Sequence, residues 1–551
     1  MPDSPTIEQA IESRLAALLA ANAQLVDERD QYKKLYLEML ERCRKLERGI
    51  IGPKRERLSP GDAQLTLSML QMLLGKDESP APQVEHVKAH ERAKPTGRRP
   101  LPENLPRVDL TLTLPEVERR GTDAFDKIGE DVKETVEYRR ASLVVVCAHV
   151  PKFVPKKADA PVAPEVQAQA STAPVATTPP EPPLEPRIYQ AEAPELPIPG
   201  GLAGPALLAK TVVQRWDDHL PLYRLERIWR REGLELARST ICGWHSQLAA
   251  LVDPLTEAMW KEALQAPYLC VDATGVLVQD VEKCRNGHFF VVAAPEKHVL
   301  FGFSPKHNSE AVDALLRDYK GYLVADAHTV YDHLFKSGEV KESGCWSHNR
   351  RYYFKALTSD PERARHALAF IKGLFDVERE RATAPPELRL ATRKEKSKPI
   401  VEAFFAWCEA QAPLVLDETP ISKAITYSLN QREALLRFLE DGRLPIHNNF
   451  SERQLRREAI GRKNWLFVGS DDGGKVNATF VTLLASCQLH EIEPHGYLRD
   501  LFCLLPSWSK PHVIELAPAY WKKTFERPDV QQRLAANIFR RISLDEDGDG
   551  K

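Results

Sequence analysis

The stretch from residue 268 to residue 326 contains, in order, YLCVDATGVLV (268–278), HFFVVAA (288–294), HVLFGF (298–303), SEAVDALLRDY (309–319) and YLVAD (322–326). The first three and the last are short apolar runs rich in β-branched and aromatic residues, which is typical of strands. The fourth has the apolar spacing of a helix. Three strands, a helix and a fourth strand are the order in which a ribonuclease-H-like fold begins. We therefore predict an α/β core of this kind.

Two aspartates lie on the predicted strands of this core. Asp272 is inside the first strand, among valines and leucines, where a charge is costly unless it is paired or binds a metal ion. Asp326 ends the fourth strand, and ligands bind at such strand ends in open α/β sheets. Each residue taken alone is equally an ordinary strand-end or turn aspartate.

A third acid lies in PIHNNFSERQLRREAIGRKNWLFVGS (445–470), a polar segment that closes on the strand-like WLFVG. Glu452 stands there in a dense field of cations, which is uncommon and suggests a site where a metal-binding acid meets a polyanion. A solvated basic helix face is the ordinary alternative. Two aspartates and a distant glutamate can together hold two Mg²⁺ ions, because carboxylate oxygens suit this hard cation. The neighbouring basic residues are candidate phosphate contacts: Arg453, Arg456, Arg457, Arg462 and Lys463.

Composition limits the remaining possibilities. The 551 residues carry a formal net charge of −2, so a nucleic-acid surface has to be local. The nine cysteines are scattered singly, which favours reduced thiols over a disulfide framework. No apolar run approaches the length of a membrane span, and there is no signal peptide. We expect a soluble cytoplasmic protein.

Changes in composition and periodicity divide the chain into segments. The predicted segments are an N-terminal helical or coiled-coil region (1–75), a basic linker (76–100), a small β-rich module (101–154), a Pro/Ala-rich linker (155–199), a helical, helix-turn-helix-like DNA-binding region (200–260), the first part of the α/β core (261–360), a helical insertion (361–444), the last part of the core with Glu452 (445–505), and a helical C-terminal extension with an acidic tail (506–551).

The N-terminal region repeats apolar residues every seven positions, from Ile11 to Leu46. Asn22 falls at a seam position where a buried asparagine fixes register and favours two strands. This pattern predicts a dimerising coiled coil, although Arg29 and Cys43 weaken the seam, and an amphipathic helix packed on its own domain is the alternative.

Two helical patterns that break at Gly233 follow the Pro/Ala-rich linker, and Ser239 is placed to cap the second helix. This geometry resembles a helix-turn-helix, and a plain helical hairpin is an equal alternative. The side chains available to DNA would be Arg230, Arg231, Arg238 and His245.

Several long motifs resemble the transposases of the insertion sequence 66 family, which are bacterial DDE enzymes. The matching motifs are GRRPLPENLPR, GLAGPALLAKTVVQRWDDHLPLYRLERIWRREGLELARSTICGW, VDATGVLV, GYLVADAHTVYDHL, GCWSHNRRYYFKAL and NNFSERQLRREAIGRKNWLFVGSDDGG. The resemblance implies Asp272, Asp326 and Glu452 as the DDE triad. It also implies a core of the retroviral-integrase superfamily interrupted by a helical insertion.

The motif GCWSHNRRYYFKAL is expected near the active site by the same resemblance. Cys345 and His348 have half of a zinc-site spacing, but no second pair stands nearby. Arg350 and Arg351 are predicted to contact DNA phosphates. Trp346 is predicted either to stack on an unpaired base or to pack in the interior, and Cys345 to be structural.

The chain also departs from the family pattern. Members usually carry CxxC pairs in a small zinc-binding module, whereas Cys147 is the only cysteine left there, so we predict no structural zinc. His447 stands where the family usually has Asp, and Ala273 where it commonly has Glu. Asn448 and Asn449 are predicted to support the site or to cap backbone groups.

The sequence therefore predicts a DNA transposase of bacterial origin that works in the cytoplasm and is associated with the nucleoid when bound to DNA. It would bind terminal inverted repeats and target DNA as a dimer or larger homo-oligomer, with two Mg²⁺ ions, for which Mn²⁺ should substitute, and with possible accessory proteins of the same element. The alternatives are a catalytically inactive DNA-binding relative and a hydrolytic nuclease on the same fold.

Overall fold

The computed structural model describes Asn22 and residues 101–103, 105–139, 142–155, 188–191 and 194–544. The chain divides into two compact units, residues 1–97 and 98–551, and the second is described below. The predicted coiled coil, the basic linker, most of the Pro/Ala-rich linker and the end of the acidic tail lie outside the described residues. No helix in the described ranges is long and apolar enough to cross a membrane.

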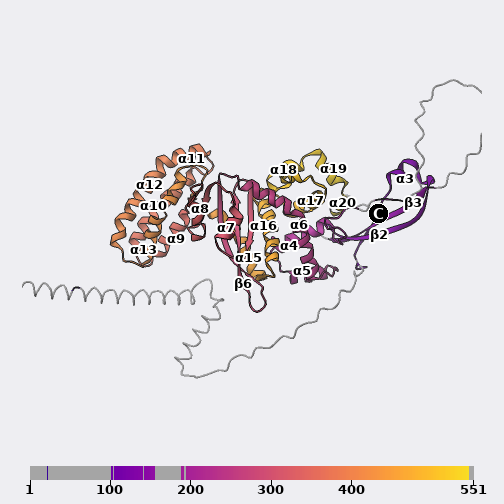
Figure 1. Ribbon diagram of the computed structural model, residues 1–551, viewed down its shortest axis with the longest axis horizontal. Coiled ribbons are helices and arrows are strands. Elements are labelled where there is room, and N and C mark those ends of the chain that lie inside the picture. The colour runs from indigo at the N-terminus through magenta and orange to yellow at the C-terminus, as the bar shows by residue number, and fades with distance from the viewer. Residues whose placement is uncertain are drawn as a thin grey trace, which may run out of the picture. The chain divides into compact units, whose positions relative to one another are not determined.

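A six-stranded sheet forms the centre of this unit (Figure 1). Its elements are β5 (Tyr268–Val278), β6 (Arg285–Ala294), β7 (His298–Ser304), α7 (Ser309–Leu316), β8 (Gly321–Val324), β9 (Val340–Ser343) and β10 (Phe467–Val468). The predicted strands and the helix between them are confirmed, while β9 had not been predicted. The expected strand WLFVG shrinks to β10, because the preceding helix continues to Trp465.

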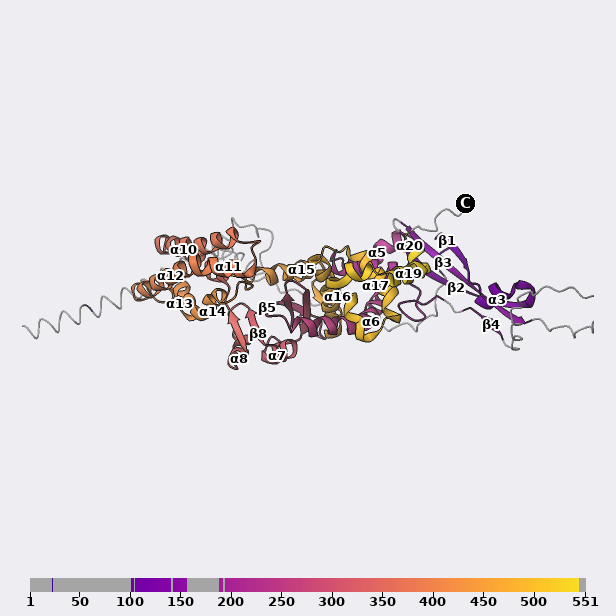
Figure 2. The same cartoon turned by 90° about the horizontal axis from the view of Figure 1, so that it is seen from above.

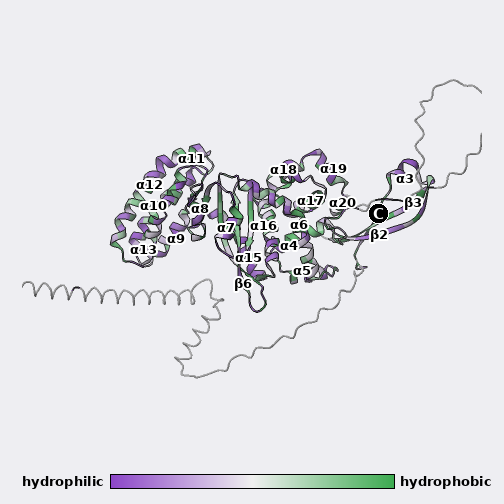
Figure 3. Cartoon of the chain, viewed as in Figure 1, coloured by the Kyte–Doolittle hydropathy of each residue, from purple (hydrophilic) through white to green (hydrophobic). Residues whose placement is uncertain are grey.

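The strands are ordered β7-β6-β5-β8-β9, and β10 pairs with the end of β5. β5, β6 and β7 form an antiparallel meander, whereas β8 pairs with β5 in parallel and β9 with β8 in parallel. The chain is thus a mixed α/β protein, as predicted, and its strand order is the one expected of a ribonuclease-H-like core. Figure 3 shows hydrophobic residues along the strands of this sheet, which is buried between helices.

Helix α16 (Asp471–Leu489) covers the edge strand β7. The hydroxyls of Thr482 and Ser486 accept the backbone N–H groups of Phe301 and Val299, at 2.8 and 3.1 Å. These side chains satisfy the edge groups that would otherwise be free to pair with another chain. Ser470 caps α16 by accepting from the N–H of Gly473.

A second, four-stranded sheet precedes the core in sequence. Its elements are β1 (Arg107–Thr111), α3 (Pro115–Arg120), β2 (Phe125–Arg139), β3 (Ser142–Pro155) and β4 (Tyr189–Gln190). Val145 and Cys147 belong to the main core, whereas Val144 and Val146 pack against Phe539 of the C-terminal helix α20. Because both faces of β3 are buried, its sequence is almost continuously apolar.

Helices α4 (Pro205–Trp216), α5 (Leu222–Arg231) and α6 (Arg238–Ala263) form the predicted helical region. The chain turns at Gly233, whose φ of 87° is one that glycine adopts without strain. The predicted cap at Ser239 is wrong, since Ala237 is the residue before the first turn and makes no side-chain cap. His245 is also not available to DNA, because it is 2% exposed and contacts Thr211 Oγ1 at 3.2 Å.

Glu137 joins the second sheet to α4. Its fully buried carboxylate accepts the backbone N–H of Leu207 at 2.8 Å and that of Tyr138 at 2.7 Å. Gly204 lies directly against it, and any β-carbon there would collide with Glu137 Oε2. Burial raises the pKa of Glu137 to about 8, so this acid holds a proton at neutral pH.

This buried acid makes folding stability depend on pH. The folded chain keeps the proton up to about pH 8 and the unfolded chain loses it near 4.5, so the free energy of unfolding contributed here is full below about 4.5 and falls as pH rises to about 8. We expect the melting temperature of Glu137→Gln to fall less than that of the wild type over this interval. Glu134→Gln, on the exposed part of the same strand, should keep the wild-type slope. Equal slopes for all three proteins would show that Glu137 does not titrate in this way.

The segment between the two parts of the core is helical and has its own core. Its elements are α9 (Trp346–Ala356), α10 (Pro361–Glu380), α11 (Pro386–Thr392), a π-helical turn (Arg393–Ser397), α12 (Lys398–Gln411), α13 (Pro420–Asn430) and α14 (Arg432–Leu436). The short helix α8 (Asp332–Phe335) instead precedes β9 and packs against the core of the sheet. Figure 2 shows α10 to α14 together beside the sheet, next to the start of α15.

The chain returns from this helical segment through α15 (Asn449–Trp465), which packs on β5 and β6. The remaining helices are α17 (Pro494–Leu504), α18 (Pro518–Phe525), α19 (Pro528–Ala536) and α20 (Ile538–Ser543). Asp500 of α17 ties two of them together, because its buried carboxylate accepts from Arg499 Nε at 2.7 Å and from Arg540 Nε at 2.9 Å.

Candidate active site

Asp272 and Asp326 lie next to each other because of the register between two parallel strands. Cys270 of β5 is paired with Val324, the last residue of β8. Asp272 and Asp326 each follow two residues later, so both lie where β8 ends. The sequence therefore places the two carboxylates at one point of the sheet, as predicted for strand-end ligands.

Glu452 reaches the same place from the first turn of α15. Its charge and that of Asp326 both raise the pKa of Asp272, after burial, which is the larger cause. The N–H of Ala273 donates to Asp272 Oδ1 at 2.8 Å and opposes the shift, and the net result is a pKa of about 6. The structure thus brings the three predicted carboxylates into one electrostatic cluster.

Helix α9 contributes two basic side chains to this cluster. His348, which is 8% exposed, has Nε2 3.2 Å from Glu452 Oε1 and Nδ1 3.4 Å from Asp326 Oδ1. Arg351 is exposed, and its Nη2 lies 3.4 Å from Glu452 Oε1. His348 therefore stands between Asp326 and Glu452, and Arg351 also lies beside Glu452.

The start of α9 is anchored in the helical segment. Trp346 is fully buried, its Nε1 donates to the carbonyl of Leu435 at 2.9 Å, and its backbone N–H donates to Ile446 at 3.1 Å. Of the two predictions for Trp346, interior packing is therefore correct and base stacking is wrong. Cys345 is also buried and accepts the backbone N–H of Asn448 at 3.2 Å, as expected of a structural residue.

The residues before Glu452 hold α15 against the sheet. Asn448 is fully buried, and its Nδ2 donates to the carbonyl of Val271 at 2.7 Å. His447 stacks on Phe375 of α10, with ring centroids 5.9 Å apart and planes at 22°. Nothing in the structure explains why histidine stands at this position. Asn449 is the first residue of α15 and is half-buried.

The basic residues of α15 divide into two groups. Arg453, Arg456 and Lys463 are exposed, and their spacing places them on one face of the helix. Arg457 instead pairs with Asp217 at 2.5 Å, and Arg462 donates to Thr274 Oγ1 at 2.9 Å. Arg457 and Arg462 therefore attach α15 to the rest of the protein, and only the first group faces solvent as a basic stripe. We call Arg453, Arg456 and Lys463 the α15 stripe.

Other predicted DNA contacts lie on the surface as well. Arg350 of α9 is exposed. In the helical region, Arg230 and Arg238 are 57% and 64% exposed, and both pair with Glu226 at 3.1 Å. Arg231 is exposed at the end of α5. These four side chains are accessible, although Glu226 partly compensates the charges of Arg230 and Arg238.

Tyr331 is a site residue that the sequence did not reveal. It is buried five residues after Asp326, and its pKa is raised by burial and then by the charges of Asp272 and Asp326. Its ring therefore forms part of the wall beside the two aspartates. Tyr331 ends a 3-10 turn (Thr329–Tyr331); its local pattern does not indicate this position, although it lies within the motif GYLVADAHTVYDHL.

The donor chemistry of the three acids fits a divalent cation. Carboxylate oxygens are the ligands that Mg²⁺ prefers, and the charges of Glu452 and Asp326 add to burial in raising the pKa of Asp272. As the side chains stand, no group of three or more His, Cys, Asp or Glu in the described part of the chain is arranged to hold a metal ion. Binding therefore requires the carboxylates to turn toward a common point, away from His348 and Arg351.

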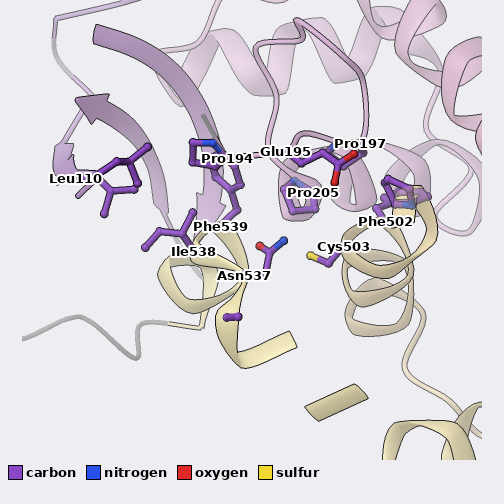
Figure 4. Close-up of a pocket in the computed structure, with 13 residues that line it drawn as sticks. Leu110, Pro194, Glu195, Pro197, Pro205, Phe502, Cys503, Asn537, Ile538 and Phe539 are labelled. Atoms are coloured by element: carbon purple, nitrogen blue, oxygen red, sulfur yellow. The ribbon is translucent and has the colours of Figure 1, made fainter. Parts of the chain in front are cut away.

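The pocket in Figure 4 lies elsewhere, between β1 and helices α17 and α20. Cys503 and Asn537 face it, and most of its other lining residues are prolines and apolar side chains. Glu195 is its only carboxylate, so it offers no chemistry comparable to that of the three clustered acids. We therefore place the candidate active site at the end of β8, beside β5.

Two family models match this chain. Residues 200–476 match the family model described as Transposase IS66 family, and residues 38–110 match the model described as Transposase C of IS166 homeodomain. The first match includes every residue of the cluster described above.

Three curated proteins of Sinorhizobium fredii (strain NBRC 101917 / NGR234) are similar over most of their length. The uncharacterized protein y4hP is 26% identical over 512 residues, which cover 87% of this chain and 88% of y4hP. The uncharacterized protein y4qI is 27% identical over 536 residues, covering 93% and 94% of the two chains. The uncharacterized protein y4jD is 26% identical over 529 residues, covering 91% and 97%.

Proposed function

Because the chain belongs to the IS66 family of transposases, we propose that it cuts DNA strands at the ends of its insertion sequence and joins them to target DNA with Asp272, Asp326 and Glu452. Membership in the family implies a phosphoryl-transfer enzyme. The observation that carries the residue assignment is the convergence of these three carboxylates, which come from β5, the end of β8 and α15.

The three acids would hold two divalent cations, Mg²⁺ or Mn²⁺. When bound, such ions activate an attacking water or 3′-hydroxyl and stabilise the leaving oxygen. In the cutting step water attacks phosphorus and the 3′-oxygen of the cut strand leaves as a 3′-hydroxyl. In the joining step that 3′-hydroxyl attacks a target phosphate, and the 3′-oxygen of the target strand leaves. Arg351 and Arg350 lie on the helix that borders the acids, where they would bind the phosphates on either side of the reacting one.

The α15 stripe supports a path for DNA away from the acids. It begins at Arg453, next to Glu452, and continues along the exposed face of the helix to Lys463. We assign the backbone of the terminal inverted repeats to this stripe, and further DNA contacts to Arg230, Arg231 and Arg238. Arg457 and Arg462 are assigned to positioning α15 instead. The protein would act as a homo-oligomer, paired through the coiled coil that the sequence predicts within residues 1–75, with any accessory proteins of the same element.

An assay of both chemical steps tests this function. Purified full-length protein is incubated with Mg²⁺ and end-labelled duplexes that carry the two ends of the element encoding this chain, and the products are scored for nicks and for joined strands. We expect both products, and neither in EDTA. Nicks without joining would indicate a hydrolytic nuclease, and binding without nicks would indicate an inactive relative.

The α15 stripe predicts a salt-dependent contribution to DNA affinity. Each of Arg453→Ala, Arg456→Ala and Lys463→Ala should weaken binding and reduce the slope of log K against log[salt] by about 1, because one phosphate contact is lost. Fluorescence anisotropy at several salt concentrations measures this slope. Arg432→Ala, an exposed arginine paired with Glu409 in the helical segment, is the control and should leave the slope unchanged. If the slopes of the stripe variants equal that of the control, DNA does not follow α15.

A further inference from the structure

We propose that Asn448 is a positioning residue, which sets the location of Glu452 relative to Asp272 by tying the start of α15 to β5. The inference rests on the proposed function of these two acids. Asn448 does not itself belong to the carboxylate cluster, and it acts through the backbone.

The side chain of Asn448 bonds to the neighbouring strand instead of capping its own helix. Asn448 is the residue before the first turn of α15, where an asparagine side chain normally caps the N–H groups of that turn. Here the side chain makes no cap, and its Nδ2 donates to the carbonyl of Val271 on β5 at 2.7 Å. Because a carbonyl only accepts, this bond also fixes the orientation of the amide. Asn448 therefore bonds to β5 rather than to the first turn of its own helix.

The hydrogen bonds of Asn448 connect the chain segments around the acids. Val271 directly precedes Asp272, and the carbonyl of Asn448 accepts the N–H of Glu452 at 3.3 Å. The backbone N–H of Asn448 donates to Cys345 Sγ, three residues before His348. One buried residue thus joins the three chain segments that carry Asp272, Glu452 and His348.

The amide oxygen of Asn448 makes no hydrogen bond to the described residues. Asn448 Oδ1 is buried and has no hydrogen-bond partner among the residues described. Leaving a buried acceptor unpaired is unfavourable for folding and offsets part of what the bond to Val271 contributes to stability. The bond to Val271 still fixes the helix start on the strand.

Replacing Asn448 by Ser separates positioning from stability. Serine is also a good capping residue but is too short to reach β5, so Asn448→Ser restores an ordinary helix start while removing the tie. Small displacements of reacting groups can lower rates a hundredfold. We expect Asn448→Ser to melt close to the wild type, to cut the labelled element ends about a hundredfold more slowly, and to need more Mg²⁺ for half of its maximal rate.

Asn477 of α16 supplies the matched control. It is 1% exposed, its Nδ2 donates to Glu458 Oε2 at 3.1 Å, and its Oδ1 likewise has no partner among the described residues. Asn477→Ala should lower the melting temperature as much as Asn448→Ala does, yet keep the wild-type rate and Mg²⁺ requirement. An equal loss of rate in Asn477→Ala would show that any buried amide nearby matters, and would overturn the proposal.

A measurement without DNA distinguishes this proposal from the proposed function. Mn²⁺ should raise the melting temperature of the wild type and of Asn477→Ala, and raise that of Asn448→Ser and Asn448→Ala less. The proposal is overturned if both Asn448 variants show the full Mn²⁺ shift. If the wild type shifts with Mn²⁺ but neither cuts nor joins DNA, the proposed function fails while the positioning role stands or falls on this shift alone.

Discussion

Replacing Glu452 by Gln is expected to abolish both strand cutting and strand joining by the full-length protein. The change keeps the size of the side chain but removes one of three clustered negative charges, and it turns a hard anionic ligand into a neutral amide. Because the carboxylates act as a unit, we expect a loss of at least about a hundredfold, the scale found when one preorganised charge-stabilising group is removed. Asp272→Asn and Asp326→Asn should have the same effect.

The matched control is Asp472→Asn, which removes a carboxylate that is 88% exposed at the start of α16. It should keep the wild-type rate. Glu452→Gln should melt close to the wild type, since the lost repulsion of Asp272 and Asp326 is offset by the weakened contacts with His348 and Arg351. Cutting by Glu452→Gln at the wild-type rate in Mg²⁺ would exclude Glu452 from the catalytic cluster.

Replacing Arg393 by Ala is expected to cause the largest loss of stability. Arg393 is 1% exposed and begins the π-helical turn between α11 and α12. Its Nε and Nη2 each donate to one carboxylate oxygen of Glu378 at 2.7 Å, and its remaining N–H groups donate to three backbone carbonyls. Those carbonyls belong to Phe438, Asp441 and Leu444, so a single guanidinium holds the chain that leads to α15 and Glu452.

Alanine at this position leaves the charge of Glu378 and the three carbonyls without their partner. Losing one member of a buried ion pair costs about 3–5 kcal/mol. We expect calorimetry to show a correspondingly lower unfolding temperature for the helical segment, and the cutting rate to fall because Leu444 lies only four residues before Asn448. Arg432→Ala breaks a surface pair with Glu409 and a contact of the guanidinium with the ring of Phe405, and should cost about 1–2 kcal/mol, less than Arg393→Ala. Equal melting of the two variants would show that Arg393 does not hold this segment together.

Much of the catalytic cluster could be predicted from the sequence because it depends on local strand patterns. The apolar runs around Asp272 and Asp326 identify two strands, and their parallel pairing places both acids at one point. Glu452 could be singled out by its basic surroundings, but its place beside the aspartates was implied only by the resemblance to a family, because it depends on how α15 returns after a long helical segment.

The partners of charged side chains could not be predicted. Arg457 and Arg462 have the same local sequence context as Arg453 and Arg456, yet they contact Asp217 and Thr274, which are far away in the chain. Trp346 could be predicted only as either a base contact or an interior residue, and its burial and its bond to the carbonyl of Leu435 decide for the interior. Such long-range contacts leave no pattern in a single sequence.

We propose that Asp272, Asp326 and Glu452 share one metal centre. Cleavage of the polypeptide at the bound ion tests this most directly. Fe²⁺ in place of Mg²⁺, with ascorbate and peroxide, generates hydroxyl radicals that cut the nearest backbone of the full-length protein. We predict three cuts, one beside each residue, which excess Mg²⁺ suppresses together and which Asp326→Asn removes together. A single cut, cuts at unrelated positions, or cuts that persist in Asp326→Asn would contradict a shared centre.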